Sequence, residues 1–187
     1  TEKVEEEIAG QFPAAKVERL DFDTARTRTA YERIISDFEK GKTQILIGTQ
    51  MLSKGLDFGN VSVVGILSAD SLMNFPDFRA HERAYQLMVQ VSGRAGRRDK
   101  RGTVILQTTQ PEHPLIRMVQ HFAYKEMVSL QLSERSMFRY PPYYRLIVLI
   151  LRSRNEEALQ EMSALYAEKL RARLGERVLG PVTPPIT

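Results

Sequence analysis

Apolar and polar positions follow two alternating patterns along residues 1–134, and together these patterns predict a fold class. Short apolar or alternating runs predict strands at residues 15–20, 44–47, 61–69 and 103–107. Apolar residues three or four positions apart predict helices before Pro13, between Thr24 and Gly41, over about 78–94, and one or two over 115–134. Strands that alternate with helices at these lengths form βαβ units. We therefore expect an α/β fold in which helices flank one parallel sheet.

The pattern changes after residue 134. Residues 138–144 (FRYPPYY) form a junction rich in proline and aromatic residues, so we assign residues 1–134 to a first domain and 135–187 to a second. In the second domain we expect a strand at 145–151, a helix begun by Ser153 or Asn155, and a short strand near Val178. The apolar face of that helix holds Leu159, Met162, Tyr166, Leu170 and Leu174. A β-α-β piece of about 50 residues has a thin core, so we expect the truncated beginning of a small α+β domain.

Composition excludes several classes of protein. The longest apolar runs are far shorter than the ~20 residues of a membrane-spanning helix, so we expect no membrane segment. The chain has no cysteine, which excludes disulfides, thiolate metal sites and cysteine nucleophiles. It opens with the acidic segment TEKVEEE and shows neither a signal peptide nor an initiator methionine. We expect a cytoplasmic piece of a longer protein.

Charge is distributed unevenly. The net charge is −3 over residues 1–41 and +7 over residues 42–187, which together give +4. A basic later part suggests an anionic partner such as nucleic acid or nucleotide phosphate, although a modest excess alone is weak evidence. The densest basic cluster lies at residues 94–101 (RAGRRDKR).

Residues 90–97 (QVSGRAGR) are the first candidate for chemistry. Arg94 and Arg97 are three residues apart, which in a helical turn places both guanidinium groups on the same side. Guanidinium groups bind phosphate oxygens with two hydrogen bonds, and this suits a γ-phosphate whose charge grows during transfer. The alternative is a basic helix end that stops in a glycine turn.

Residues 45–58 (ILIGTQMLSKGLDF) are the second candidate. A strand end, a hydroxyl, a lysine and a carboxylate follow one another there, at the edge where open α/β sheets bind ligands. Thr49 and its neighbouring amides can hold a phosphodiester, and Asp57 can accept a hydrogen bond from a ribose hydroxyl. As structural residues, Thr49 caps a helix and Asp57 belongs to a turn.

These two stretches together resemble the second RecA-like lobe of superfamily 2 helicases, with residues 48–57 as motif V and residues 90–97 as motif VI. Further segments are similar to the primosomal protein N′ (PriA) family of bacterial replication-restart helicases. They are residues 1–7 (TEKVEEE), 21–24 (DFDT), 68–70 (SAD), 76–83 (PDFRAHER) and 138–142 (FRYPP). The resemblance implies an ATP-driven 3′ to 5′ motor on single-stranded DNA that opens forks for replication restart.

The resemblance also implies roles for the residues of the nucleotide site. Arg94 and Arg97 would engage the γ-phosphate, with Arg97 as the arginine finger, and Gln90 would sense the nucleotide. Gly55 and Asp57 would border the ribose. ATP and magnesium are the cofactors implied for the complete enzyme.

On the DNA side, the resemblance places Thr49, Gln50 and Lys54 near the sugar-phosphate backbone. Contacts of this kind position DNA without reading its sequence. The implied partners are single-stranded and forked DNA, primosome proteins and single-stranded DNA-binding protein, in the bacterial cytoplasm at the nucleoid, with no membrane.

Three features of the sequence limit these implications. The family usually has a histidine where this chain has Leu56. The family's cysteine-rich zinc insertion, which precedes the TEKVEEE segment, is not in this sequence, so we assign no metal site to this chain. No P-loop sequence and no DExH-type acidic motif occur. An arginine finger acts on a nucleotide that other residues hold, so we expect this chain alone to hydrolyse no ATP.

Several alternatives stay open. The chain can be a lobe of another superfamily 2 translocase or RNA helicase, or a non-catalytic nucleic-acid-binding module. Five aromatic residues can stack on unpaired bases, but a domain seam is favoured for them because the nearby prolines stiffen a junction: Phe75, Phe78, Tyr140, Tyr143 and Tyr144. Asp70 is either a coupling acid or a strand-end acid. The three histidines lack metal-ligand spacing, which favours surface or packing roles.

Overall fold

The computed structural model of the 187-residue chain describes residues 1–49, 52, 58–59, 61–96 and 102–183. The chain divides into two compact units, Thr1–Tyr143 and Tyr144–Thr187. Each unit is described by itself.

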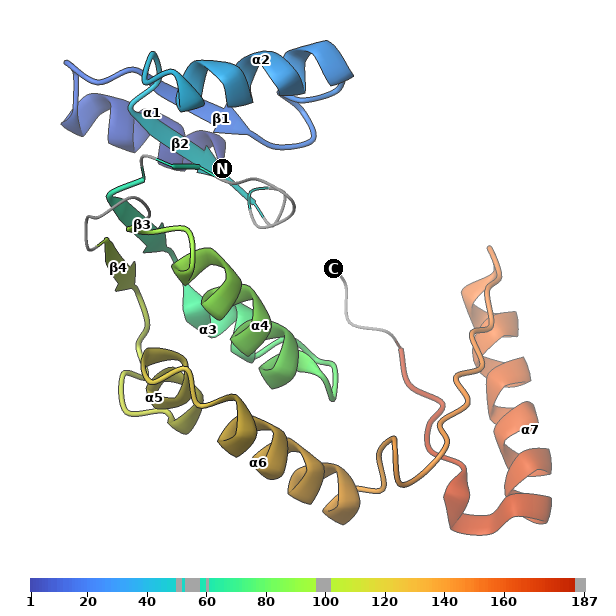
Figure 1. Cartoon of the computed structure of the whole chain (residues 1–187). Coiled ribbons are helices and arrows are strands. Elements are labelled where there is room, and N and C mark those ends of the chain that lie inside the picture. Colours follow the sequence, from blue (N-terminus) through green and yellow to red (C-terminus); the bar gives the residue numbers. More distant parts are fainter. Residues whose placement is uncertain (50–51, 53–57, 60, 97–101, 184–187) are drawn as a thin grey trace. The chain divides into compact units, whose positions relative to one another are not determined.

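The first unit begins with two helices and two strands (Figure 1). They are α1 (Glu2–Gln11), β1 (Val17–Leu20), α2 (Arg28–Glu39) and β2 (Ile45–Gly48). Strands β1 and β2 are parallel, with Val17 opposite Ile45 and Leu20 opposite Gly48. Helix α2 starts where the Thr27 side chain accepts a hydrogen bond from the Ala30 N–H at 3.1 Å. A cluster that we call the small core holds this part together, with Leu20, Ile34, Ile35 and Phe58 buried.

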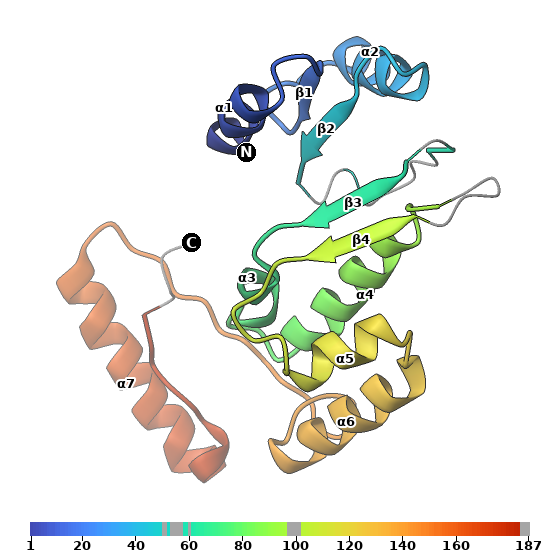
Figure 2. The same ribbon diagram turned by 90° about the vertical axis from the view of Figure 1, so that its left-hand side faces the viewer.

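The rest of the first unit contains two more strands and four helices among the described residues (Figure 2). In chain order they are β3 (Val63–Ile66), α3 (Ala69–Met73), α4 (Ala80–Ser92), β4 (Thr103–Leu106), α5 (Pro114–Gln120) and α6 (Tyr124–Met137). Strands β3 and β4 are parallel, with Val63 opposite Thr103. Ten buried residues form the large core: Ala69, Met73, Ala84, Tyr85, Met88, Leu115, Ile116, Met118, Val119 and Met127. Ile66 and Leu106, one from each strand, pack against it.

The predicted α/β class, with parallel strands flanked by helices, is confirmed. The expectation of one sheet is not, because the four described strands form two sheets of two strands, β1–β2 and β3–β4. Periodicity indicates which residues are buried in a strand, but it contains no information about which strand edges share hydrogen bonds.

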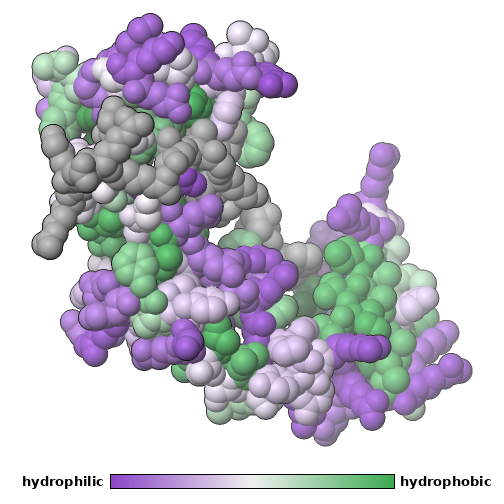
Figure 3. Space-filling model, in the orientation of Figure 1, coloured by the Kyte–Doolittle hydropathy of each residue, from purple (hydrophilic) through white to green (hydrophobic). Residues whose placement is uncertain are grey.

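The second unit contains α7 (Glu156–Leu174), which confirms the predicted helix, followed by a short 3-10 turn at Gly175–Arg177. Asn155 begins α7 by accepting a hydrogen bond from the Ala158 N–H at 3.1 Å. The two strands expected at 145–151 and near Val178 are wrong, since the structure assigns no strand to either segment. A strand requires a neighbouring backbone, and the first segment is exposed instead, with Ile147 87% exposed. Figure 3 shows apolar surface over this unit.

A hydrogen-bonded carboxylate joins the start of the chain to β1. The Thr1 hydroxyl donates to Asp21 Oδ2 at 2.7 Å, and the Thr24 N–H donates to Asp21 Oδ1 at 3.0 Å. Arg19 Nε lies 3.2 Å from Asp21 Oδ2. The Thr1 hydrogen bond, the Thr24 hydrogen bonds and the Arg19 charge lower the pKa of Asp21 from 3.8 to about 2, against the opposing effect of burial.

Acid should therefore destabilise the chain through Asp21. Its lowered pKa means that the folded chain favours the carboxylate, so this stabilisation is present above pH 3.8 and is lost as the pH falls through about 2. We expect Asp21→Asn to remove part of the acid-induced fall in the thermal unfolding midpoint. Asp23→Asn, at an exposed neighbouring carboxylate, is the matched control. Wild-type and Asp21→Asn curves that run parallel in acid would contradict the role of Asp21.

Candidate functional site

The first candidate stretch, residues 90–97, begins in the last turn of α4. The helix ends at Ser92. Beyond it, the N–H groups of Arg94 and Ala95 donate to the carbonyls three residues earlier, those of Val91 and Ser92, at 3.0 and 3.2 Å. This is the tighter bonding of a turn. Arg94 therefore lies in a turn after the helix, and the expectation that the helix extends to Arg94 is wrong.

Gly96 ends this turn and forms a hydrogen bond near the second candidate stretch. Its φ of +85° is a conformation that glycine adopts without steric cost. The Gly96 N–H donates to the carbonyl of Val61 at 3.1 Å. Val61 packs against the small core to which Phe58 belongs, and Phe58 is the last residue of the stretch 45–58. The turn after α4 is thus hydrogen-bonded to the segment that follows the second candidate stretch.

Of the residues expected to bind nucleotide, the structure describes Gln90 and Arg94. Gln90 is exposed in the last turn of α4, and Arg94 is half-buried in the turn that follows. The other three lie outside the described residues, namely Gly55, Asp57 and Arg97. The structure therefore places one guanidinium of the pair at this end of α4, and the pairing itself stays a prediction.

Thr49 is the described member of the three residues expected to contact DNA. It is exposed directly after β2, and its carbonyl accepts a hydrogen bond from the Leu52 N–H at 3.1 Å. Gln50 and Lys54 lie outside the described residues. Thr49 therefore lies directly after the carboxyl end of a parallel strand, as the sequence predicts.

Both ends of the stretch 45–58 are held by the small core. At one end, a Cβ on Gly48 would lie 2.7 Å from the Leu20 carbonyl oxygen, so this position requires glycine. At the other end, Phe58 is buried with its ring edge-on to Phe38, at 4.8 Å between centroids. These contacts fix where the loop leaves the core and where it returns.

Asp70 lies at the start of α3 and binds the segment after β4. Its Oδ1 accepts from the Thr108 hydroxyl at 2.7 Å, and its Oδ2 accepts from the Thr109 N–H at 2.9 Å. The Thr109 N–H, followed by the Thr108 hydroxyl, lowers the pKa of Asp70. Both carboxylate oxygens have structural partners, which favours the strand-end acid over the coupling acid.

Two of the three histidines, His113 and His81, pack against neighbouring residues of the first unit. His113 caps α5, because its Nδ1 accepts a hydrogen bond from the Leu115 N–H at 3.2 Å. Its ring lies 5.4 Å from that of His81, and burial lowers the pKa of the His113 imidazole. Among the described residues, no three His, Asp or Glu side chains are grouped so as to hold a metal ion.

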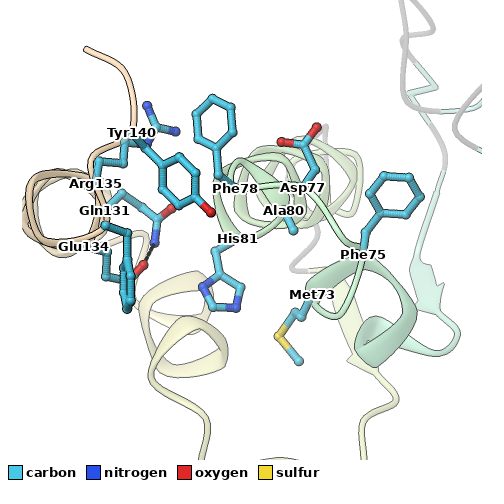
Figure 4. A pocket seen from close by; sticks show the side chains of 11 residues that line it. Met73, Phe75, Asp77, Phe78, Ala80, His81, Gln131, Glu134, Arg135 and Tyr140 are labelled. Carbon is cyan, nitrogen blue, oxygen red and sulfur yellow. Dashed lines mark hydrogen bonds between the residues drawn. The ribbon is translucent and has the colours of Figure 1, made fainter. Parts of the chain in front are cut away.

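A pocket that the sequence did not indicate lies at the other end of α4 (Figure 4). Its cavity of about 260 Å³ is bounded by α3, the connection from α3 to α4, and the end of α6. Phe78 and Tyr140 stack there, 5.0 Å apart between centroids and 16° from parallel. They form a packing seam inside the first unit. The sequence does show aromatic residues in segments 75–78 and 138–140. It does not show that these two segments pack against each other.

None of the helices described here has the length and apolar content to cross a membrane.

Comparison with known proteins matches the first half of the chain to one family. The model of the helicase conserved C-terminal domain matches residues 1–99. A structure of a variant of S. cerevisiae Dbp5 bound to RNA and ADP BeF3 is also similar, with a TM-score of 0.45 and 19% identity. The match covers 71% of this chain and 36% of that one.

Curated relatives match along the whole chain. It is 44% identical to Replication restart protein PriA of Bacillus subtilis and 40% identical to that of Synechocystis, and each match covers 100% of this chain. The protein of the same name in Haemophilus influenzae is 36% identical, again over 100% of this chain. The chain spans 23% of the length of the first two relatives and 26% of the third.

Proposed function

The chain belongs to the family of the helicase conserved C-terminal domain, and from that premise we propose that it is the C-terminal helicase lobe of an ATP-dependent DNA helicase. The relatives that match it from end to end are named replication restart proteins, so the proposed task is the restart of stalled replication forks. One observation carries the proposal. The hydrogen bond from Gly96 to Val61 places the end of residues 90–96 beside the segment that follows residues 45–58, and these two stretches have the spacing of helicase motifs VI and V.

In this proposal the chain supplies half of an ATP site. Arg94 and Arg97 bring guanidinium groups to the γ-phosphate, and Arg97 stabilises the charge that develops during phosphoryl transfer. Gln90 responds to the nucleotide, and Gly55 and Asp57 border its ribose. The P-loop that holds the other phosphates and magnesium belongs to another part of the longer protein, so this chain alone hydrolyses no ATP.

The same lobe contributes to the DNA track. Thr49, Gln50 and Lys54 contact the sugar-phosphate backbone, and the complete protein moves 3′ to 5′ on single-stranded or forked DNA. Primosome proteins and single-stranded DNA-binding protein are its proposed partners, in the bacterial cytoplasm at the nucleoid. Residues 1–134 form the helicase lobe in this proposal, and residues 135–187 begin the next domain.

Charge reversal separates a motor lobe from a module that only binds nucleic acid. We expect Arg94→Glu with Arg97→Glu to leave most of the chain's affinity for single-stranded DNA, because these arginines face the nucleotide in a motor. The measurement is fluorescence anisotropy over a series of salt concentrations. In a binding module the same change would lower the affinity and make the salt slope shallower by about 0.7 per lost phosphate contact.

A matched double reversal, Arg26→Glu with Arg28→Glu, controls for the change in net charge, since both side chains are exposed in the other half of the first unit. The motor assignment is refuted if the Arg94 and Arg97 double reversal greatly lowers both the DNA affinity and its dependence on salt concentration while the Arg26 and Arg28 double reversal does not.

A further inference from the structure

The pocket at the start of α4 has two exposed aromatic rings, Phe75 and Phe138, and the Phe138 ring also lies tilted beside Tyr140 of the packing seam, 6.5 Å between centroids. Phe75, in the connection from α3 to α4, is 50% exposed, and Phe138, directly after α6, is 63% exposed. Phe78 is occupied by its stack on Tyr140 and by the Arg135 guanidinium, 5.2 Å from the ring centre. The pocket therefore combines a fixed aromatic seam with two rings whose surfaces are open to solvent.

Polar groups line the pocket between these rings. The Gln131 amide is buried and donates to Glu134 Oε2 at 2.7 Å, and the His81 imidazole adds a third polar group. Figure 4 places Gln131 and Glu134 on the side opposite Phe75 and Met73, with His81 between them. An aliphatic occupant would take water from these groups without replacing its hydrogen bonds, which is unfavourable. A planar ligand with apolar faces and a polar edge satisfies both kinds of lining.

Two arginines lie beside the edge of the pocket that Asp77 forms. Arg79 Nε and Arg83 Nη1 both pair with the Asp77 carboxylate, at 3.6 and 2.8 Å, and both side chains remain about half exposed. Two guanidinium groups beside one carboxylate leave a net positive charge at this edge. Phosphate oxygens are natural partners for such guanidinium groups.

The position of the pocket also suits a ligand site. It lies at the N-terminal end of α4, beyond the carboxyl end of β3, and ligands of open α/β sheets bind outside the carboxyl ends of the strands. This helix of 13 residues is about 20 Å long at 1.5 Å per residue, and at its opposite end Gln90 lies in the last turn and Arg94 in the turn that follows. The pocket is therefore separate from the candidate nucleotide site.

We propose that this pocket receives unpaired bases of single-stranded DNA, which stack against Phe75 and Phe138 while Arg79 and Arg83 face an adjoining phosphate. The site rests on the proposed function, and it adds a base contact apart from residues 49–54. Because every base has a stackable face, such a contact is independent of sequence.

The test compares the 187-residue chain and its variants on two oligonucleotides, one of thymidines and one of the same length made of abasic sugars. Wild type should bind the thymidine strand more tightly. Phe75→Ala and Phe138→Ala should each weaken that binding by about 5- to 100-fold, as expected for the loss of one stacked base. They should leave binding of the abasic strand unchanged. Phe75→Tyr, which keeps an aromatic face, should retain the affinity.

Phe22→Ala is the matched control, since Phe22 is 79% exposed and lies outside the pocket. Thermal unfolding midpoints equal to wild type would show that the pocket variants are folded. If wild type binds the thymidine strand and both pocket variants match it, the pocket site is overturned and the proposed function stands. If wild type binds neither strand at low salt, the proposed DNA function fails and the pocket site fails with it.

Discussion

Replacement of Arg97 by alanine in the longer helicase should lower its DNA-stimulated ATP turnover by about 10³- to 10⁵-fold, the range measured for arginine fingers. The guanidinium interacts with charge that appears mainly in the transition state, so the loss should fall on kcat more than on KM. Steady-state ATPase assays at saturating single-stranded DNA measure both constants. Arg94→Ala, at the partner arginine in the turn after α4, should also reduce kcat.

A measurement of DNA affinity shows whether the loss of ATP turnover in Arg97→Ala arises at the nucleotide site. Arg97→Ala should keep its affinity for single-stranded DNA, because the proposed DNA contacts lie at residues 49–54 and in the pocket. Arg28→Ala is the control, since that side chain is 91% exposed on α2 and pairs only with Glu32 among the described residues. ATP turnover that survives Arg97→Ala at near wild-type levels would remove Arg97 from the role of finger.

Truncation of Met88 to alanine should destabilise the first unit by about 2–5 kcal/mol, the usual cost of such a change in a packed core. Met88 is fully buried at the centre of α4, where it joins the large core that supports both β3 and β4. Urea unfolding followed by circular dichroism gives the free energy of unfolding, and the midpoint should fall while the slope stays unchanged.

The comparison for Met88 is Gln86→Ala on the same helix. Gln86 is exposed, so its truncation should change the free energy of unfolding by less than about 0.5 kcal/mol. A Met88 variant as stable as the Gln86 variant would show that α4 does not depend on the large core. Contacts other than those of the large core would then have to hold the turn at residues 93–96 in place.

Local pattern was sufficient for most helices and for the buried strands of the first unit. The apolar spacing that predicted the helices between Thr24 and Gly41 and over about 78–94 includes Ile34 and Ile35, which are buried in the small core, and Ala84 and Met88, which are buried in the large core. The pattern also overextended α4 by two residues, because spacing does not show that hydrogen bonds tighten into a turn after Ser92.

The candidate site was predictable only in part. The order of residues 45–58 and 90–97 marked both stretches, and Thr49 and Gln90 are exposed as ligand-binding residues must be. The hydrogen bond from Gly96 to Val61, just beyond the first of these stretches, was not predictable, since every residue type except proline has the same backbone donor and acceptor. The pocket was missed for a related reason. Its walls come from segments about 60 residues apart, near Phe75 and near Phe138.

The sequence by itself determined most strands and helices of the first unit, the buried faces of α2 and α4 and the two stretches with helicase spacing, because all of these depend on neighbours along the chain. Tertiary structure decided that the four strands in the described part of the chain pair as two sheets, that residues 145–151 form no strand, and that a pocket opens at the start of α4. These outcomes depend on which surfaces meet across long separations. Apolar periodicity indicates which face of a helix or strand must be buried. Only the folded chain determines which other segment buries it.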